Sequence, residues 1–179
     1  MLMTSGNPVP GAARATTAVA LRDGRRVLLR PLLPTDRVPL AAAFERLTDE
    51  SQQLRFGSVP HTLSEARLRY LVDAVDGMDH IAFVAFAEDD PERLVGVARI
   101  LRYPNDPESL DVGVTVADDY QGDGLGHVLV QVLAAHRPRP SRRVVTQIAT
   151  GNDRAMSLLS AFGTPRRIGD GQIVIEFPA

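Results

Sequence analysis

Helical and strand periodicities alternate along the first part of the chain. The pattern predicts a strand over residues 26–32 and then three helices, at residues 35–47, 51–56 and 62–77. Thr35 and Asp36 are expected to cap the first helix, whose apolar residues recur at the spacing of an amphipathic face. Thr62 and Glu65 have the spacing of a capping box, which predicts where the third helix begins.

A run of strands follows these helices. Residues 81–87 and 94–101 are almost wholly apolar, as expected of strands that are covered on both faces. Residues 109–116 alternate strictly, which places Asp111 on the face opposite Leu110 and Val112. Beyond them the pattern predicts a helix, a strand, a helix and a closing hairpin, at residues 125–133, 144–149, 155–162 and 169–177.

This order of elements predicts the fold class. A mostly antiparallel N-terminal meander, followed by a parallel βαβα unit, indicates an α+β (mixed α/β) fold with one central mixed sheet flanked by helices. Residues 1–20 are small, polar and rich in Pro, Gly and Ala, and we expect them to be a disordered tail. Residues 21–179 then form one domain, a size that buries a sizeable core.

Composition excludes several classes of function. The chain of 179 residues has a formal net charge of −2, which gives no general attraction to nucleic acid or to an anionic membrane. No apolar run approaches the roughly 20 residues of a membrane span, and no secretory signal is recognisable, so we expect a cytoplasmic protein. Cysteine is absent and the four histidines are scattered, so no metal site is expected. All twenty basic residues are arginine, which favours a GC-rich bacterial source.

A glycine-rich turn between a strand and a helix is the most informative segment. Gly122, Gly124 and Gly126 precede or open the helix, where free N–H groups and the helix dipole attract anions such as phosphate. The spacing matches neither a P-loop, which needs Gly-Lys-Ser/Thr, nor a dinucleotide fingerprint, since His127 occupies its third glycine position. An ordinary tight turn is the alternative, although three glycines in five positions exceed what a turn requires.

The turn also resembles a known motif. Gln121, Gly124 and Gly126 match the (Arg/Gln)-x-x-Gly-x-(Gly/Ala) pattern of the GNAT superfamily of acetyl-CoA-dependent N-acetyltransferases. A second GNAT motif, Asn-x-x-Ala, matches Asn152 and Ala155. Over residues 21–177 the chain is most similar to the catalytic domain of bacterial protein-lysine acetyltransferases. The resemblance implies a GNAT fold, acetyl-CoA as co-substrate without a metal, and ten cofactor-binding residues: Val114, Thr115, Val116, Gln121, Gly122, Gly124, Leu125, Gly126, His127 and Asn152.

In this resemblance the residues have separate roles. The edge of Val114–Val116 would pair with the pantetheine arm, and the Gln121–His127 turn would hold the pyrophosphate. Asn152 is equally well explained as a helix N-cap. Asp123 stands where relatives usually have Arg or Lys, and its negative charge would repel a pyrophosphate by about 1 kcal/mol at 4 Å in water. Leu159 stands where many GNAT enzymes have a tyrosine that protonates the thiolate.

Asp111 is the candidate catalytic residue. Presenting a neutral lysine amine at pH 7 costs about 4.6 kcal/mol, so direct transfer of the acetyl group benefits from a general base near the acceptor. Asp111 lies on the polar face of its strand, at a position that resembles the site of a catalytic glutamate in the protein-lysine acetyltransferases. A solvated or salt-bridged strand aspartate is the alternative interpretation.

Three functions therefore compete. The first is an enzyme that acetylates a primary amine, above all a protein lysine. The second acetylates a small amine or an antibiotic, and the third is a non-catalytic acyl-CoA-binding sensor. The expected partners are acetyl-CoA and the amine acceptor, without nucleic acid or membrane. The sequence leaves open whether the protein forms a homodimer. The basic stretch at residues 136–143 could bind the CoA 3′-phosphate or nucleic acid, or form a solvated loop.

Overall fold

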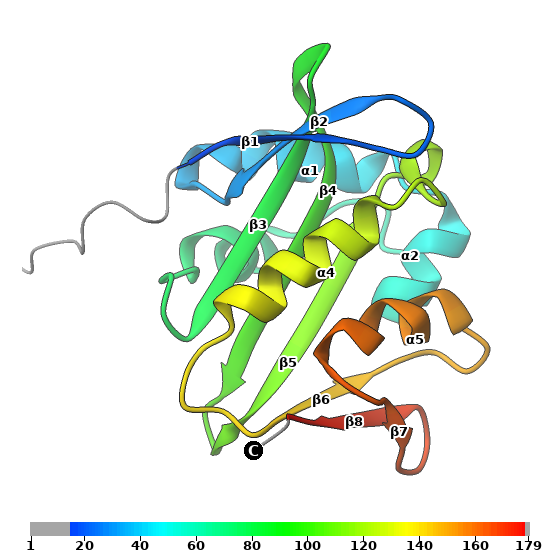
Figure 1. The fold of residues 1–179 in the computed structure, drawn as a ribbon. Coiled ribbons are helices and arrows are strands. Elements are labelled where there is room, and N and C mark those ends of the chain that lie inside the picture. The colour runs from blue at the N-terminus through cyan, green and yellow to red at the C-terminus, as the bar shows by residue number, and fades with distance from the viewer. Residues whose placement is uncertain (1–14, 178–179) are drawn as a thin grey trace, which may run out of the picture.

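The computed structural model describes residues 15–177, which contain one eight-stranded mixed sheet (Figure 1). Its first five strands pair antiparallel in chain order, and the second to the fifth are the meander that the sequence predicts. The sixth strand is parallel to the fifth, and the last two strands complete the sheet in antiparallel pairing. In spatial order the strands are β1 (Thr17–Ala20), β2 (Arg26–Pro31), β3 (His80–Ala87), β4 (Asp90–Tyr103), β5 (Asp106–Val116), β6 (Arg143–Gln147), β8 (Gln172–Glu176) and β7 (Arg166–Arg167).

Helices cover both faces of the sheet. The described helices are α1 (Arg37–Glu45), α2 (Asp49–Phe56), α3 (Glu65–Leu68), α4 (Leu125–His136) and α5 (Asp153–Leu159). Short 3-10 turns at Pro34–Asp36, Asp118–Tyr120 and Ser160–Phe162 adjoin them, and a π-helical turn, Arg69–Asp73, continues α3. None of the helices in residues 15–177 has both the length and the apolar composition for crossing a bilayer. The predicted mixed sheet with flanking helices is therefore confirmed.

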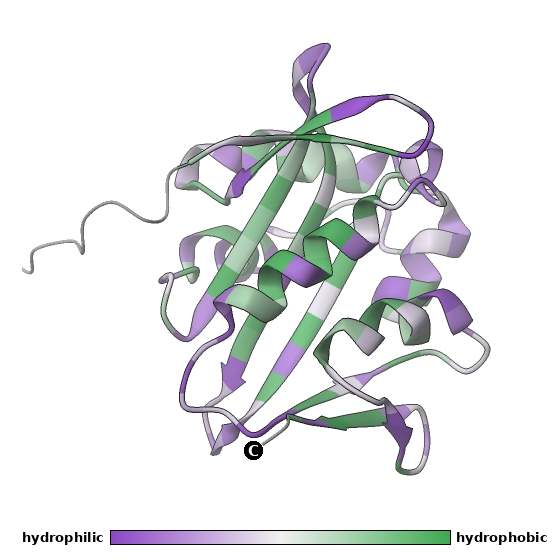
Figure 2. Ribbon diagram, in the orientation of Figure 1, coloured by the Kyte–Doolittle hydropathy of each residue, from purple (hydrophilic) through white to green (hydrophobic). Residues whose placement is uncertain are grey.

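Two hydrophobic clusters explain this layering. On one face of the sheet, Leu40 of α1 packs with Leu71, Val84 and Leu94. On the other face, Leu129 of α4 packs against the sheet. The central strands β3 and β4 are coloured mostly as hydrophobic in Figure 2, as expected of strands covered on both sides. In β5 the strict alternation has the predicted result, because Leu110 and Val112 belong to the cluster under α4.

Three local predictions differ from the structure. Thr17–Ala20 form strand β1, so the predicted tail of residues 1–20 extends too far; residues 1–14 lie outside the described part. The Asp36 side chain does not cap α1, because it forms a two-pronged ion pair with Arg30 at 2.7 Å. Ser64, rather than Thr62, caps α3 by accepting the Arg67 N–H at 3.2 Å.

The parting of β5 from β6 is the feature of the fold that positions the site. The two strands are paired only at Ser109 and Leu110, opposite Arg143 and Val144. From there β6 pairs with β8, whereas β5 continues to Val116 alongside β4 alone. One edge of β5 therefore presents backbone N–H and C=O groups that no strand of the described chain pairs. Figure 1 shows α4 and α5 on either side of this opening.

Candidate active site

A cavity of about 410 Å³ fills the opening between β5 and β6. This volume lies within the range of ligand pockets in proteins. Its walls come from the open edge of β5, the glycine turn before α4, and the first turn of α5. Nine of the ten predicted cofactor-binding residues line it, namely Val114, Thr115, Val116, Gln121, Gly122, Gly124, Gly126, His127 and Asn152.

Leu125 is the exception among the ten. Its side chain is completely buried in the core beneath α4 and does not line the cavity. Its backbone N–H lies in the first turn of the helix, where the first intrahelical bond, from Val128 N–H to Gly124 O, is made at 3.2 Å. Any role of Leu125 toward a ligand is thus limited to the backbone.

The glycines of the turn have separate physical tasks. Gly122 and Gly124 have φ values of 87° and 95°, in the left-handed region that side chains disfavour. Gly126 has no such φ, but a Cβ there would lie 3.0 Å from a methyl of Leu158 on α5. The turn therefore requires glycine for chain direction at two positions and for helix packing at the third, and it leaves the N-terminus of α4 open to the cavity.

The Gln121 side chain links the glycine turn to neighbouring segments by hydrogen bonds. Its Nε2 donates to Val116 O at 3.1 Å and to Ser51 Oγ at 3.3 Å, while its Oε1 accepts from Arg154 at 3.1 Å. Asp118 belongs to the same hydrogen-bond network, because its carboxylate accepts from the Thr48 N–H at 2.9 Å and from Ser51 Oγ. This network ties the start of α2 to the glycine turn.

The negative charge of Asp123 beside the turn is offset in part by Arg25, which also pairs with Asp23. Arg25, from the loop between β1 and β2, reaches Asp123 Oδ2 at 3.4 Å and donates to Asp119 O at 2.7 Å. The same guanidinium lies 3.8 Å above the ring of Tyr120, which holds it in place. The repulsion expected from the sequence is therefore reduced by a counter-charge that the fold supplies.

Two further arginines line the cavity and were missed by sequence reasoning. Arg22 lies beside Gly124, with its Nε 3.6 Å from where a Cβ of that residue would be. Arg154 lies in the first turn of α5 and bonds Gln121. Both positive charges flank the N-terminus of α4, where an anion is already favoured. No local sequence signal distinguishes them from the other solvent-exposed arginines.

Asn152 caps α5, as one of its two predicted roles requires. Its Oδ1 accepts the Ala155 N–H at 3.1 Å, and the residue also lines the cavity. The basic stretch at residues 136–143 follows the opposite end of α4 and contributes no residue to the cavity. Its Arg142 and Arg143 pair with Glu108 and Asp106, which agrees with a solvated, salt-bridged loop.

Asp111 lies in a second cavity, of about 580 Å³, on the α2 side of β5. The two cavities share wall residues, among them Arg55, Val112 and Thr146, so they meet where β5 and β6 part. Burial raises the pKa of the Asp111 carboxyl, against the opposing effects of Thr146, the Arg55 charge and the Val112 N–H. A raised pKa makes the carboxylate a stronger base.

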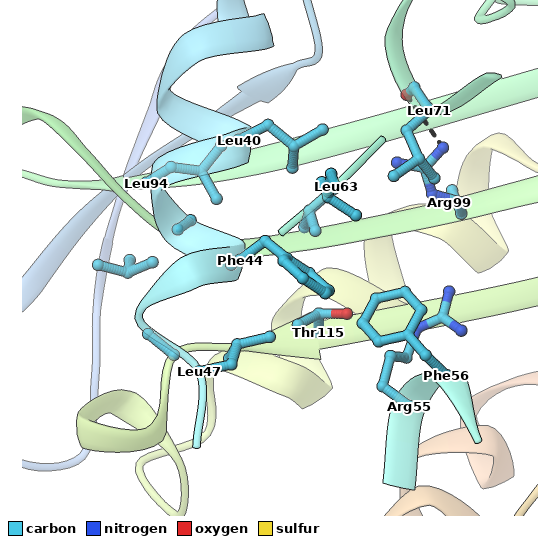
Figure 3. Close-up of a pocket in the computed structure, with 15 residues that line it drawn as sticks. Leu40, Phe44, Leu47, Arg55, Phe56, Leu63, Leu71, Leu94, Arg99 and Thr115 are labelled. Carbon is cyan, nitrogen blue, oxygen red and sulfur yellow. Dashed lines mark hydrogen bonds between the residues drawn. The ribbon is translucent and has the colours of Figure 1, made fainter. Parts of the chain in front are cut away.

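Arg55 lines both cavities. It extends from α2 beside Phe56, whose ring lies 5.0 Å from the guanidinium carbon (Figure 3). A Cβ on Gly113 would lie 3.0 Å from that carbon, so the guanidinium rests directly on β5. Burial lowers its pKa, and Asp111 is the nearby charge that opposes this effect. The stretch Leu54-Arg55-Phe56 is part of the resemblance to bacterial protein-lysine acetyltransferases, but sequence reasoning gave Arg55 no role in the site.

Comparisons with known proteins agree with this geometry. Residues 26–164 match the model of a family described as acetyltransferase (GNAT) domain. The protein named acetyltransferase PA5475 of Pseudomonas aeruginosa is 36% identical over 138 residues, which cover 76% of this chain and 73% of that protein. Acetyltransferase Pat of Mycolicibacterium smegmatis is 34% identical over 115 residues, 64% of this chain but only 34% of that protein.

A solved structure has the same fold over nearly its whole length. The crystal structure of the GNAT domain of S. lividans PAT superposes with a TM-score of 0.78 at 25% identity, covering 90% of this chain and 96% of that chain. The open β5 edge, the glycine turn and these matches agree with one another. The chain therefore belongs to the GNAT family of acetyltransferases, which take the acetyl group from acetyl-CoA.

Proposed function

We propose that this protein transfers the acetyl group of acetyl-CoA directly to a primary amine, with Asp111 as the general base. The observation that carries the proposal is the meeting of two cavities at the parted strands. One contains the anion-binding turn and the open strand edge, and the other contains a buried carboxylate. A donor and an acceptor can thus approach the same segment of β5 from opposite faces of the sheet.

The donor side fits acetyl-CoA. The exposed N–H groups at the start of α4, together with Arg22 and Arg154, suit the pyrophosphate. The open edge of Val114–Val116 suits the amide groups of the pantetheine arm, which would pair as an added strand does. When bound, acetyl-CoA supplies a thioester carbonyl that accepts the amine nitrogen.

On the acceptor side, Asp111 removes the proton that keeps the amine from reacting. Its carboxylate takes one proton from the ammonium group, directly or through a water molecule, and leaves a lone pair on nitrogen. The C–N bond then forms as the C–S bond breaks. The nitrogen loses its second proton to solvent, and the CoA thiolate leaves and takes a proton from solvent. Burial in the cavity makes Asp111 a stronger base than an exposed aspartate.

Two acceptor classes fit this chemistry. A protein lysine is the expectation from the resemblance, and the similarity to Pat and PAT proteins supports it. A small amine is the second candidate, and a specific observation favours it. A lysine side chain enters as a lone cation, which the neighbouring Arg55 guanidinium would repel, whereas a small amine that carries its own anionic group could pair that group with Arg55.

Release of CoA across a library of lysine peptides and small amines tests the proposal. Asp111→Asn should lower kcat/KM by about 10²- to 10⁴-fold, the usual worth of a general base. Glu108→Gln is the matched control, because it removes a carboxylate from the same strand outside both cavities. Equal effects of the two substitutions would refute the role of Asp111. Binding of acetyl-CoA without release by any amine would instead support an acyl-CoA sensor.

A further inference from the structure

Arg55 is a half-buried charge that has no hydrogen-bond partner in the described chain. Among residues 15–177 its guanidinium has no hydrogen bond and no carboxylate within 4.0 Å. Its Nε is inaccessible to solvent and has no partner. The rest of the guanidinium lines the cavity, and the charge of Asp111 opposes only part of the cost of burying it. Such a group is suited to an anion that arrives with a ligand.

The neighbouring Arg99 is different in this respect. Its guanidinium donates to Leu71 O at 3.0 Å and contacts His80 Nε2 at 3.2 Å, as Figure 3 shows for the Leu71 contact. Burial, followed by the charge of Arg55, lowers the pKa of Arg99 to about 10. Arg99 therefore has partners of its own, and its positive charge strengthens the demand for an anion beside Arg55.

Arg55 and Asp111 lie side by side along β5. The guanidinium rests on Gly113, and Asp111 precedes Gly113 by two residues, so both groups belong to one face of the strand. Two residues of strand separate these positions by roughly 7 Å. An ammonium and a carboxylate attached to one carbon atom, each with a hydrogen bond of about 2.9 Å, bridge such a separation.

The acceptor therefore has a definable charge pattern. A pyrophosphate is not the anion for Arg55, because the exposed amides and the arginines that suit it lie at the glycine turn. A lysine side chain offers one positive charge for Asp111 and leaves Arg55 unpaired. A zwitterion with a carboxylate next to its amine satisfies both groups together.

We propose that the acceptor is a free α-amino acid, whose carboxylate binds Arg55 while its amine faces Asp111. This proposal rests on the proposed acetyl transfer and names its substrate class. The remaining cavity wall includes Phe56, Tyr103 and Ile148, with the exposed Asp170 at the rim. Polar groups of Gln53, Thr146 and Gln147 also line the cavity, so the wall sets no strict preference for the amino-acid side chain.

Pairs of acceptors that differ only in the carboxylate test the proposal. Phenylalanine is compared with phenethylamine, and leucine with 3-methylbutylamine, by CoA release at saturating acetyl-CoA. The wild-type protein should prefer the amino acid of each pair by about 100-fold in kcat/KM, the scale of a buried charge pair. Arg55→Gln should remove this preference by lowering kcat/KM of the amino acids alone, and Arg55→Lys should restore part of it.

Arg69→Gln is the matched control, because Arg69 is an exposed arginine that lines neither cavity. It should leave the preference unchanged. Since each comparison is a ratio within one protein, partial misfolding of a variant does not alter it. Equal rates for the two members of each pair, or acetylation of lysine peptides alone, would overturn the amino-acid proposal and leave acetyl transfer standing. Absence of transfer to every amine would overturn both.

Discussion

Gly113→Ala is a small change with a large expected effect. A Cβ at this position would lie 3.0 Å from the Arg55 guanidinium carbon and nearer still to Nη2. Unstrained contacts are about 3.5–4.0 Å, so the guanidinium must move by about 1 Å. A displacement of this size in a substrate-positioning group costs about 10²-fold in rate. We therefore expect kcat/KM for the best acceptor to fall by about 100-fold.

Stability should change in the opposite direction. Gly113 has no left-handed φ, so alanine fits its backbone, and alanine in a strand is favoured over glycine by roughly 0.5–1 kcal/mol. The variant should thus unfold at the same temperature as the wild-type protein or slightly higher. Thermal unfolding followed by circular dichroism separates this loss of activity from a loss of fold.

A double-mutant cycle identifies Arg55 as the cause. In an Arg55→Gln background the shorter side chain no longer reaches Gly113, so Gly113→Ala should cost little there. The two substitutions should then show a coupling of about 2.7 kcal/mol, the equivalent of 100-fold. The reasoning fails if Gly113→Ala reduces kcat/KM equally in both backgrounds, because the clash would then involve some other group.

Three further changes test the donor side and its support. Arg154→Ala should raise KM for acetyl-CoA by about tenfold with kcat unchanged, and added salt should shrink the difference; an unchanged KM at low salt contradicts this role. Gly124→Ala places alanine at a φ of 95°, which should lower the free energy of unfolding by about 1–2 kcal/mol and weaken acetyl-CoA binding. Gly77→Ala, at a φ of 74° outside both cavities, is the control and should lower stability alone. Burial pushes the Asp118 pKa upward, but the donors from Ser51 and Thr48 outweigh it, so the net pKa is lowered. Asp118→Asn should therefore lower the free energy of unfolding by about 1 kcal/mol above pH 4, and the difference should vanish as the pH falls through the lowered pKa; a constant difference at all pH values would contradict the assignment.

The elements that the sequence predicted well are those in which burial of one face makes hydrophobic residues recur at a regular spacing. The alternation from Leu110 to Val116 located β5 and assigned its faces, because one face packs under α4. The glycine turn was recognisable because left-handed φ values and a close helix contact each require glycine. Both signals are local, and both survive in a single sequence.

The parts that sequence reasoning missed depend on contacts between distant segments. Arg25, which also pairs with Asp23, offsets part of the Asp123 charge, and Arg55 meets Gly113 only because α2 packs on β5. An arginine with a ligand role looks the same in the sequence as one with a solvated surface role. Two predicted helix starts were also wrong, because Arg30 binds the Asp36 carboxylate and because α3 begins at Glu65, directly after its cap Ser64.

Calorimetric titration with acetyl-CoA tests most directly whether the opening between β5 and β6 is the donor site. The wild-type protein should bind one acetyl-CoA per chain, and Gly126→Val, which forces α4 away from Leu158, should weaken this binding at least tenfold. Unchanged affinity in the variant, or no heat with the folded wild-type protein at millimolar acetyl-CoA, would contradict the account.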